Sequence, residues 1–261
     1  MYGAGHSERV LGRALAGRRD EVVIATKFGN TFDESTREIT GEDASPEYVR
    51  SACEASLRRL GTDRIDLYQL HLSGYDPVEA VQVREALEEL VTAGLIRAYA
   101  WSTDDPDRAR VFAAGEHCAA VQHELNVLSD APALIELCET HGLASINRSP
   151  LAMGLLTGKF DAGSRLPPND IRGQAPAWLK WFRDGRPAPE WLERLTAVRG
   201  ILQDGGRSLA AGALGWILGR SVRTVPIPGF RTVAQVEDNL SALEHGPLSA
   251  DELRQVEELL R

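Results

Sequence analysis

Three residues whose side chains can exchange protons lie at or near the ends of predicted strands, where functional side chains are often found. Lys27 ends the apolar run EVVIATK, His71 ends the run RIDLYQLH, and Tyr2 lies in the N-terminal stretch YGAGHSE. A phenol, an ammonium and an imidazole held together can transfer a proton, because a neighbouring cation lowers the pKa of a phenol. Taken singly, each residue has an ordinary explanation as a solvated strand tip, a satisfied polar residue or a loop residue.

The scarcity of lysine makes Lys27 more informative. Lysine occurs only at Lys27, Lys159 and Lys180, while arginine supplies nearly all of the positive charge. The two side chains are not interchangeable, because only lysine presents a compact ammonium whose pKa shifts readily. A lysine that is kept in an arginine-rich chain therefore indicates a place where arginine does not serve, and we favour a functional role for Lys27.

The segments that must position these residues alternate between strands and helices. Apolar, β-rich runs predict strands at 21–27, 64–71, 96–102, 118–126, 143–149 and 224–228. Helical patterns predict helices at 45–60, 77–93, 105–114, 131–141, 209–218, 233–243 and 249–261. This alternation is typical of a parallel sheet with right-handed connections, either closed into a barrel or doubly wound. No GxGxxG turn follows the first strand, which argues against a Rossmann sheet, and no linker divides residues 1–261, which we assign to one domain.

One long segment interrupts the alternation. Residues 160–191 contain five prolines, several glycines and the aromatic residues Trp178, Trp181 and Phe182. Long ordered excursions between a strand and its returning helix often carry function. The segment is either a lid whose aromatic residues cover a substrate or a plain surface insertion.

Composition excludes several classes of function. The net charge of −9 opposes binding to nucleic acid, because the phosphate backbone repels an acidic protein. No apolar run approaches the roughly 18–20 residues that cross a membrane, and the N-terminus lacks the features of a signal peptide. The three widely spaced cysteines, Cys53, Cys118 and Cys138, indicate reduced thiols and no metal site. We expect a cytoplasmic protein that acts on a small molecule.

Several motifs in the same order resemble the aldo-keto reductases. They are YGAGHSERVLGRAL, EVVIATKFG, RIDLYQLH, VQHELNVL, SPLAMGLLTGKF and IPGFRTVAQVEDNL, spread from residue 2 to about residue 245. The resemblance implies a (β/α)8 TIM barrel and the NADPH-dependent reduction of aldehydes and ketones, or the reverse oxidation. By motif, Tyr2 matches the catalytic tyrosine of that family, Lys27 its lysine and His71 its histidine.

The same resemblance implies roles for these three residues. Negative charge grows on a carbonyl oxygen when hydride attacks its carbon, so a proton donor at that oxygen lowers the barrier. Tyr2 would be the donor and the ammonium of Lys27 would favour its phenolate form. A neutral imidazole at His71 would hydrogen-bond the carbonyl oxygen and orient it.

The cofactor NADP(H) would be held by three further groups of residues. Ser102 and Gln122 match residues that bind the nicotinamide carboxamide, and Thr103 replaces the asparagine of the family. Gln122 has a competing interpretation as a polar core residue whose hydrogen bonds are satisfied locally. The turn that binds the pyrophosphate would comprise Ser149, Pro150, Leu151 and Gly154, with Arg148 as a further cofactor contact.

The adenosine end of the cofactor would lie between the last strand and its helix. The matching residues are Gly229, Arg231, Gln235 and Asn239. Arg231 is the natural partner of the 2′-phosphate, because a guanidinium forms paired hydrogen bonds with phosphate oxygens, and it favours NADP(H) over NAD(H). Asn239 has a competing interpretation as a surface amide on a helix.

The chain departs from the family pattern at its beginning. The first two strands, the first helix and the aspartate that pairs with the catalytic lysine have no counterpart, so we expect a barrel lacking these elements. We favour a start codon that was assigned too late; a trimmed protein and a genuinely short chain are the alternatives. Exposed parallel edges then predict association with a second copy of the chain, a homo-oligomer, and weak or absent activity for residues 1–261.

Two other functions compete with a carbonyl reductase. A non-catalytic subunit that only binds a nicotinamide nucleotide would fit the missing elements, and a lyase would use Lys27 as a Schiff base. The sequence gives little information about the identity of the substrate. The loop LSGYDP after His71 is expected to line the substrate pocket, and Trp101 either lines it or packs inside the barrel.

Overall fold

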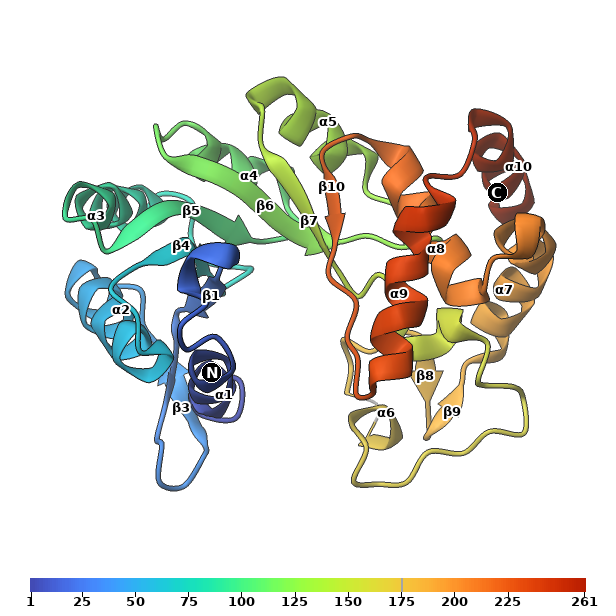
Figure 1. The fold of residues 1–261 in the computed structure, drawn as a ribbon, viewed down its shortest axis with the longest axis horizontal. Helices are drawn as coiled ribbons and strands as arrows, with labels where there is room; N and C mark the ends of the chain where they lie inside the picture. The colour runs from blue at the N-terminus through green and yellow to red at the C-terminus, as the bar shows by residue number, and fades with distance from the viewer. Residues whose placement is uncertain (175) are drawn as a thin grey trace. The chain divides into compact units, whose positions relative to one another are not determined.

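The computed structural model of the chain describes residues 1–174 and 176–261. These residues form two compact units (Figure 1). The first unit consists of Met1–His123 with Glu136–Ser145, and the second of Glu124–Ile135 with Ile146–Arg261. The first unit contains the parallel strands and intervening helices that the alternating pattern predicts.

The first unit is organised around parallel strands. Strands β1 (Ala25–Phe28), β4 (Ile65–Leu70), β5 (Ile96–Ser102) and β6 (Cys118–Glu124) lie side by side in this order and run parallel. Every residue of β4 is buried, which is typical of a strand covered on both faces. The predicted strands 64–71, 96–102 and 118–126 are therefore confirmed, with ends that differ by one or two residues.

The helices of the first unit begin where the sequence places its caps. Helix α2 (Pro46–Leu60) begins after Ser45 and helix α4 (Pro106–Ala113) after Asp105, and each cap side chain accepts a backbone N–H of the first turn. A proline follows each cap, where its missing N–H costs nothing. Helix α3 (Ala80–Thr92) packs beside α2 (Figure 1), and α5 (Pro132–His141) follows β6.

Trp101 belongs to the core of the first unit. Its side chain is fully buried, its ring lies 4.9 Å from that of Phe112, and its indole N–H donates to the carbonyl of Leu72 at 2.9 Å. Of the two interpretations of this residue, packing holds and pocket lining does not.

The N-terminal part of the first unit differs from the prediction. The first strand begins at Ala25 and not at residue 21, because Arg19–Glu21 form a 3₁₀ turn and Val23 is 79% exposed. Helix α1 (His6–Ala14) and the hairpin of β2 (Asn30–Phe32) and β3 (Ile39–Glu42) were not predicted. All residues of β3 are exposed, so this hairpin lacks the apolar alternation that makes a strand visible in a sequence.

The second unit contains the last strand and four long helices. The end of β7 (Ala144–Arg148) lies beside β10 (Thr224–Pro226), and the N–H of Ile227 donates to the carbonyl of Asn147 at 3.1 Å. Helix α8 (Leu209–Arg220) is buried over most of its length and packs against α7 (Pro189–Leu202) and α9 (Val233–His245). A short 3₁₀ helix, Asp204–Gly206, joins α7 to α8, and α10 (Ala250–Leu260) ends the chain behind a capping box at Ser249.

The long segment at 160–191 is anchored in the core of the second unit. It contains α6 (Ile171–Gln174) and the hairpin of β8 (Phe182–Arg183) and β9 (Arg186–Pro187). Trp181 and Phe182 are only 1% and 3% exposed, so they pack inside the unit and do not cover a substrate. Trp178 is exposed and is the one of the three predicted covering aromatics that remains at the surface.

The three cysteines carry free thiols, and burial raises the pKa of Cys53 and of Cys118 to about 12. Within residues 1–174 and 176–261, no helix is both long enough and apolar enough to cross a bilayer. The same residues contain no group of histidine, cysteine and carboxylate side chains arranged to hold a metal ion.

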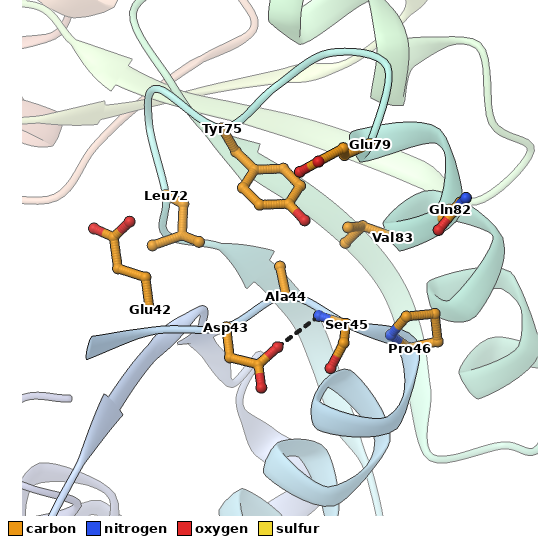
Figure 2. A pocket seen from close by; sticks show the side chains of 10 residues that line it. All are labelled: Glu42, Asp43, Ala44, Ser45, Pro46, Leu72, Tyr75, Glu79, Gln82 and Val83. Carbon is orange, nitrogen blue, oxygen red and sulfur yellow. Dashed lines mark hydrogen bonds between the residues drawn. The ribbon is translucent and has the colours of Figure 1, made fainter. Parts of the chain in front are cut away.

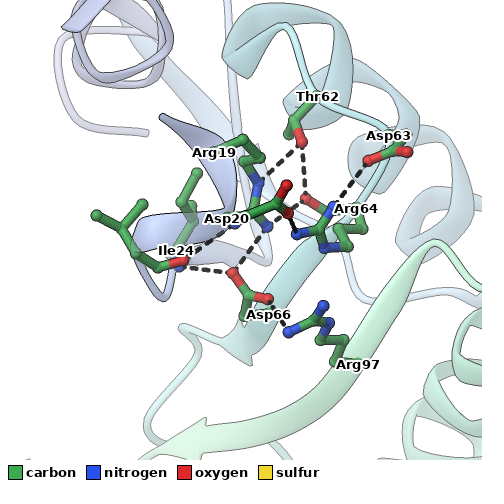
Figure 3. A network of polar contacts seen from close by, with 9 residues as sticks. Arg19, Asp20, Ile24, Thr62, Asp63, Arg64, Asp66 and Arg97 are labelled. Carbon is green, nitrogen blue, oxygen red and sulfur yellow. Dashed lines mark hydrogen bonds and ion pairs between the residues drawn. The ribbon is translucent and has the colours of Figure 1, made fainter. Parts of the chain in front are cut away.

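A buried carboxylate sets the start of strand β1 (Figure 3). One oxygen of Asp66 accepts the N–H of Ile24 at 2.8 Å and pairs with Arg19 at 2.7 Å, and the other pairs with Arg97 at 3.2 Å. The carbonyl of Ile24 accepts the N–H groups of Asp66 and Leu67. The side chain of Asp66 is 6% exposed, so these partners are its main compensation for losing water.

Replacing Asp66 should therefore destabilise the fold. We expect Asp66→Ala to lower the free energy of unfolding by about 2 kcal/mol or more, because Arg19 and the N–H of Ile24 lose their buried acceptor. Urea unfolding followed by circular dichroism measures the change. Asp63→Ala is the matched control, since Asp63 is 86% exposed and lies 3.4 Å from Arg64. Equal stabilities of the two variants would contradict the assignment.

Candidate active site

Tyr2, Lys27 and His71 come together in the first unit. The ammonium of Lys27 donates to the hydroxyl of Tyr2 at 3.1 Å, and the same ammonium lies 5.1 Å from the centre of the Tyr2 ring. The rings of Tyr2 and His71 are 5.7 Å apart and tilted by 45°. Tyr2 is 55% exposed, so its hydroxyl is open to a molecule that approaches from solvent. A phenol, an ammonium and an imidazole thus surround one accessible point.

Neighbouring parallel strands place two of these residues. Lys27 is next to the last residue of β1, and its register partner on β4 is Gln69. His71 follows the last residue of β4, and its N–H donates to the carbonyl of Phe28 at 2.8 Å. Both side chains therefore lie at the carboxyl ends of their strands, the face that carries the active site in parallel barrels.

A tight turn places Tyr2. Gly3, Ala4 and Gly5 all have positive φ angles, of 59°, 49° and 79°, and this turn leads into helix α1. At Gly5 a side chain would collide with its surroundings, because an added Cβ would lie 2.5 Å from Cδ of Arg59. The glycine is thus required both by the backbone conformation and by close packing.

The predicted residues for a carboxamide lie at the ends of the next two strands. Ser102 of β5 and Gln122 of β6 are register partners, and both are buried. Thr103 is held by three bonds: its N–H donates to the carbonyl of Gln122, its hydroxyl donates to the carbonyl of Ser73, and that hydroxyl accepts the N–H of Asp105. Thr103 therefore fixes the loop after β5, and Ser102 and Gln122 are the pair that the structure brings together.

A cavity of roughly 550 Å³ lies against the loop that follows β4. Figure 2 shows the side chains around it, which come from the β3–α2 connection, the loop after β4 and the start of α3. The lining residues are Glu42, Asp43, Ala44, Ser45, Pro46, Leu72, Tyr75, Glu79, Gln82 and Val83. Burial and the neighbouring carboxylate of Glu79 raise the pKa of Tyr75. Leu72 and Tyr75 belong to the loop that the sequence analysis expects at a substrate pocket.

The turn after β7 has an unusual backbone in the second unit. Ser149, Ala152 and Met153 have positive φ angles of 53°, 46° and 54°, and Gly154 has one of 93°. Such conformations cost energy in residues other than glycine and are found preferentially at functional sites. The buried amide of Asn126 supports the turn by donating to the carbonyl of Ser149 at 3.1 Å.

Positive side chains converge on this turn. A Cβ added to Gly154 would lie 3.3 Å from Nζ of Lys159 and 3.4 Å from Nη1 of Arg172, so both cations lie close to this glycine and leave little room for a side chain. Arg172 also donates to the carbonyl of Met153 at 3.2 Å. Burial lowers the pKa of Lys159, and the charges of Arg172 and Arg231 lower it further.

Asp170 balances only part of this positive charge. Its carboxylate pairs with Arg172 through two bonds of 2.8 and 2.6 Å, and these bonds lower the pKa of Asp170 well below its usual range. Lys159, Arg172 and Arg231 leave two positive charges in excess of this carboxylate. Like charges that are held together around a glycine form a site suited to an anion such as a phosphate group.

The remaining predicted residues lie in two places: the turn into α9 with that helix, and the end of β7 with the turn after it. Gln235 accepts the N–H of Arg231 at 2.7 Å through its side-chain oxygen, so it shapes the turn that carries Gly229 and Arg231. Arg231 is exposed and Asn239 is half-buried on α9. Arg148 forms an ion pair with Glu124 at 3.4 Å. Pro150 and Leu151 are buried, and they contribute to the form of the preceding turn.

Three residues at the turn after β7 were not predicted from the sequence. Lys159 and Arg172 border Gly154, and Asn126 supports the turn. A signal for Lys159 was available, because it is one of only three lysines and ends the motif SPLAMGLLTGK. No comparable signal marked Arg172, since its approach to Gly154 depends on the path of the long segment at 160–191.

Comparison with known proteins identifies the family of the chain. The family model described as "Aldo/keto reductase family" matches residues 1–261. An aldo-keto reductase of Schizosaccharomyces pombe whose name includes NADP(+) is 32% identical over 254 residues, which cover 94% of this chain and 72% of the relative.

Two solved structures extend the comparison. The holo form of an aldo-keto reductase from Bacillus halodurans is 30% identical, with a TM-score of 0.78, and the match covers 100% of this chain and 80% of that one. An aldo/keto reductase from Klebsiella pneumoniae in complex with NADP and acetate is 27% identical, with a TM-score of 0.70 and coverage of 100% and 77%. These similarities confirm the predicted α/β fold of the TIM-barrel type.

The cations around Gly154 should bind a phosphate anion in a pH-dependent manner. An anion favours the charged form of Lys159 and raises its pKa in the complex. Affinity for pyrophosphate should therefore be full below the pKa of Lys159 in the free protein, which lies below the ordinary 10.5, and should fall as the pH rises through it. Titration calorimetry at several pH values measures this effect.

Variants separate the cluster from a general charge effect. Arg172→Leu should weaken pyrophosphate binding about 10-fold, whereas Arg183→Leu should not, because Arg183 is exposed and pairs with Glu190. Similar affinities for these two variants would show that the anion binds elsewhere.

Proposed function

The chain belongs to the aldo/keto reductase family, and from this premise we propose that it reduces an aldehyde or ketone with NADPH or catalyses the reverse oxidation. The observation that carries the proposal is the 3.1 Å contact between the ammonium of Lys27 and the hydroxyl of Tyr2. Lys27 lies near the carboxyl end of β1, Tyr2 lies in the turn before α1, and the ring of His71 lies beside that of Tyr2. The names of the relatives that mention NADP support the choice of cofactor.

Tyr2 is the proposed proton donor. Its exposed hydroxyl would hydrogen-bond the carbonyl oxygen of the substrate and pass its proton to that oxygen as negative charge develops there. The hydrogen bond from Lys27 then stabilises the phenolate that Tyr2 becomes. In the reverse direction the same phenolate accepts the proton of the alcohol.

His71 and the strand ends are proposed to orient the substrate. A neutral imidazole donates one hydrogen bond, so His71 can hold the carbonyl oxygen close to Tyr2 without competing as a strong acid. The cavity against the loop that follows β4 contains an apolar wall at Leu72 and the aromatic ring of Tyr75. This combination fits the body of a carbonyl compound.

Each unit, taken by itself, contains residues that suit one part of NADP(H). When bound, the cofactor supplies or accepts the hydride. In the second unit, Lys159, Arg172 and Arg231 offer the positive charge that phosphate groups need, and the first two lie close to the backbone at Gly154. In the first unit, Ser102 and Gln122 are the proposed partners of the carboxamide.

Replacing the phenol should stop the chemistry and spare cofactor binding. We expect Tyr2→Phe to lower the rate of NADPH oxidation with an aromatic aldehyde by about 100-fold or more, because the proton donor is lost. The dissociation constant of NADPH, measured by fluorescence quenching, should stay within about twofold. Tyr48→Phe is the control, since its hydroxyl donates to the carbonyl of Asn30. Full turnover by Tyr2→Phe would exclude the role of Tyr2 as the acid.

The choice between NADPH and NADH should depend on Arg231. Arg231→Ala should weaken NADPH by about 10-fold and NADH by much less, because only NADPH carries the 2′-phosphate that a guanidinium binds. Arg254→Ala provides a control at an exposed arginine that pairs with Asp251. Equal losses for the two nucleotides would argue against recognition of the 2′-phosphate by Arg231.

A further inference from the structure

The contact between Tyr2 and Lys27 joins two elements that have different supports. Lys27 is held by the pairing of β1 with β4, whereas Tyr2 lies in the turn before α1. Within residues 1–174 and 176–261, the backbone hydrogen bonds of this turn are local ones, such as Ser7 N–H to the carbonyl of Tyr2. An exposed hydrogen bond contributes little net stability. Other contacts must therefore hold the phenol against the ammonium.

Glu8 makes contacts that can hold the phenol of Tyr2 against the ammonium of Lys27. Glu8 lies in the first turn of α1, six positions after Tyr2. One of its oxygens accepts the hydroxyl of Thr26 at 2.6 Å, and the other pairs with Nε of Arg59 at 2.6 Å. The side chains of Glu8 and Arg59 are each only 13% exposed. A carboxylate with this burial and two short, charge-assisted bonds is held in a fixed position.

The partner of Glu8 on β1 is the direct neighbour of Lys27. Successive side chains of a strand point to opposite faces, so Thr26 and Lys27 lie on the two faces of β1. Residues 2–8 therefore contact both faces of the strand, with Tyr2 at Lys27 and Glu8 at Thr26. Arg59 ties the same carboxylate to α2 and also bonds Ser56 at 3.2 Å.

We propose that Glu8 is a positioning residue that, through Thr26 and Arg59, fixes the hydroxyl of Tyr2 against the ammonium of Lys27. The proposal rests on the proposed function, because it concerns the same phenol and ammonium. It differs from a general stabilising role in one respect. Loss of the hydroxyl at residue 26 should separate the two catalytic groups while the fold and the cofactor site persist.

Two substitutions at Thr26 isolate the hydroxyl. Thr26→Val keeps the shape and removes the hydrogen bond to Glu8, whereas Thr26→Ser keeps the hydroxyl. We expect Thr26→Val to lower kcat about 10-fold, with the dissociation constant of NADPH unchanged within about twofold, and Thr26→Ser to restore kcat. Glu34→Gln is the matched control, because Glu34 also pairs with Arg59 but is 46% exposed and bonds Arg9 rather than Thr26.

A spectroscopic measurement tests the geometry without relying on turnover. The protein is labelled with 3-fluorotyrosine, and Tyr2→Phe identifies the fluorine resonance of residue 2 among those of the five tyrosines. Lys27→Met gives the position of that resonance when the ammonium contact is lost. Thr26→Val should move the resonance toward this position, and Thr26→Ser and Glu34→Gln should leave it in place.

The outcomes separate the two proposals. A resonance that keeps its wild-type position in Thr26→Val, or that moves equally in Thr26→Ser, overturns the positioning role of Glu8. Absence of both carbonyl reduction and NADPH binding in the wild-type protein overturns the proposed function, and the fluorine resonance still decides whether Glu8 positions Tyr2.

Discussion

The candidate active site depends on one contact between a phenol and an ammonium group at the ends of parallel strands. The phenol does not do the proposed chemistry alone, because a free phenol holds its proton too firmly at neutral pH and a neighbouring ammonium favours its phenolate form. Strand β1 presents Lys27, the turn with positive φ angles presents Tyr2, and the bond between His71 and Phe28 aligns the imidazole with both. The buried carboxylate of Asp66 and the half-buried carboxylate of Glu8 then hold β1 at its beginning and at its middle.

Much of this arrangement could be predicted from the sequence. Strands β4, β5 and β6 were predicted because buried strands of a parallel sheet are nearly continuous apolar runs. The end of the β4 run located His71, and the apolar run at 21–27 located Lys27. The helices α2 and α4 were visible through Ser45 and Asp105, each followed by proline. These are local signals, and local signals are what a sequence displays most clearly.

The features that were not predicted depend on contacts between distant segments. The β3 strand of the β2–β3 hairpin is exposed, so no apolar pattern in the sequence indicated this hairpin. Strand β1 begins later than its valines suggest, because the carboxylate of Asp66, about forty residues further along the chain, captures the N–H of Ile24. Trp181 and Phe182 resembled a substrate cover in the sequence, and only the packing of the second unit shows that they are core residues.

Arg172 has a consequence for the speed of ligand binding. Its guanidinium already forms two bonds with Asp170 and one with the carbonyl of Met153, and it lies 5.2 Å from the ring of Phe160. A side chain ordered in this way loses little rotational freedom when an anion arrives. The encounter then resembles docking onto a rigid charged surface, for which association is rapid and sensitive to ionic strength. Differences in residence time between anions would consequently arise from their fit at Gly154 and not from a folding step.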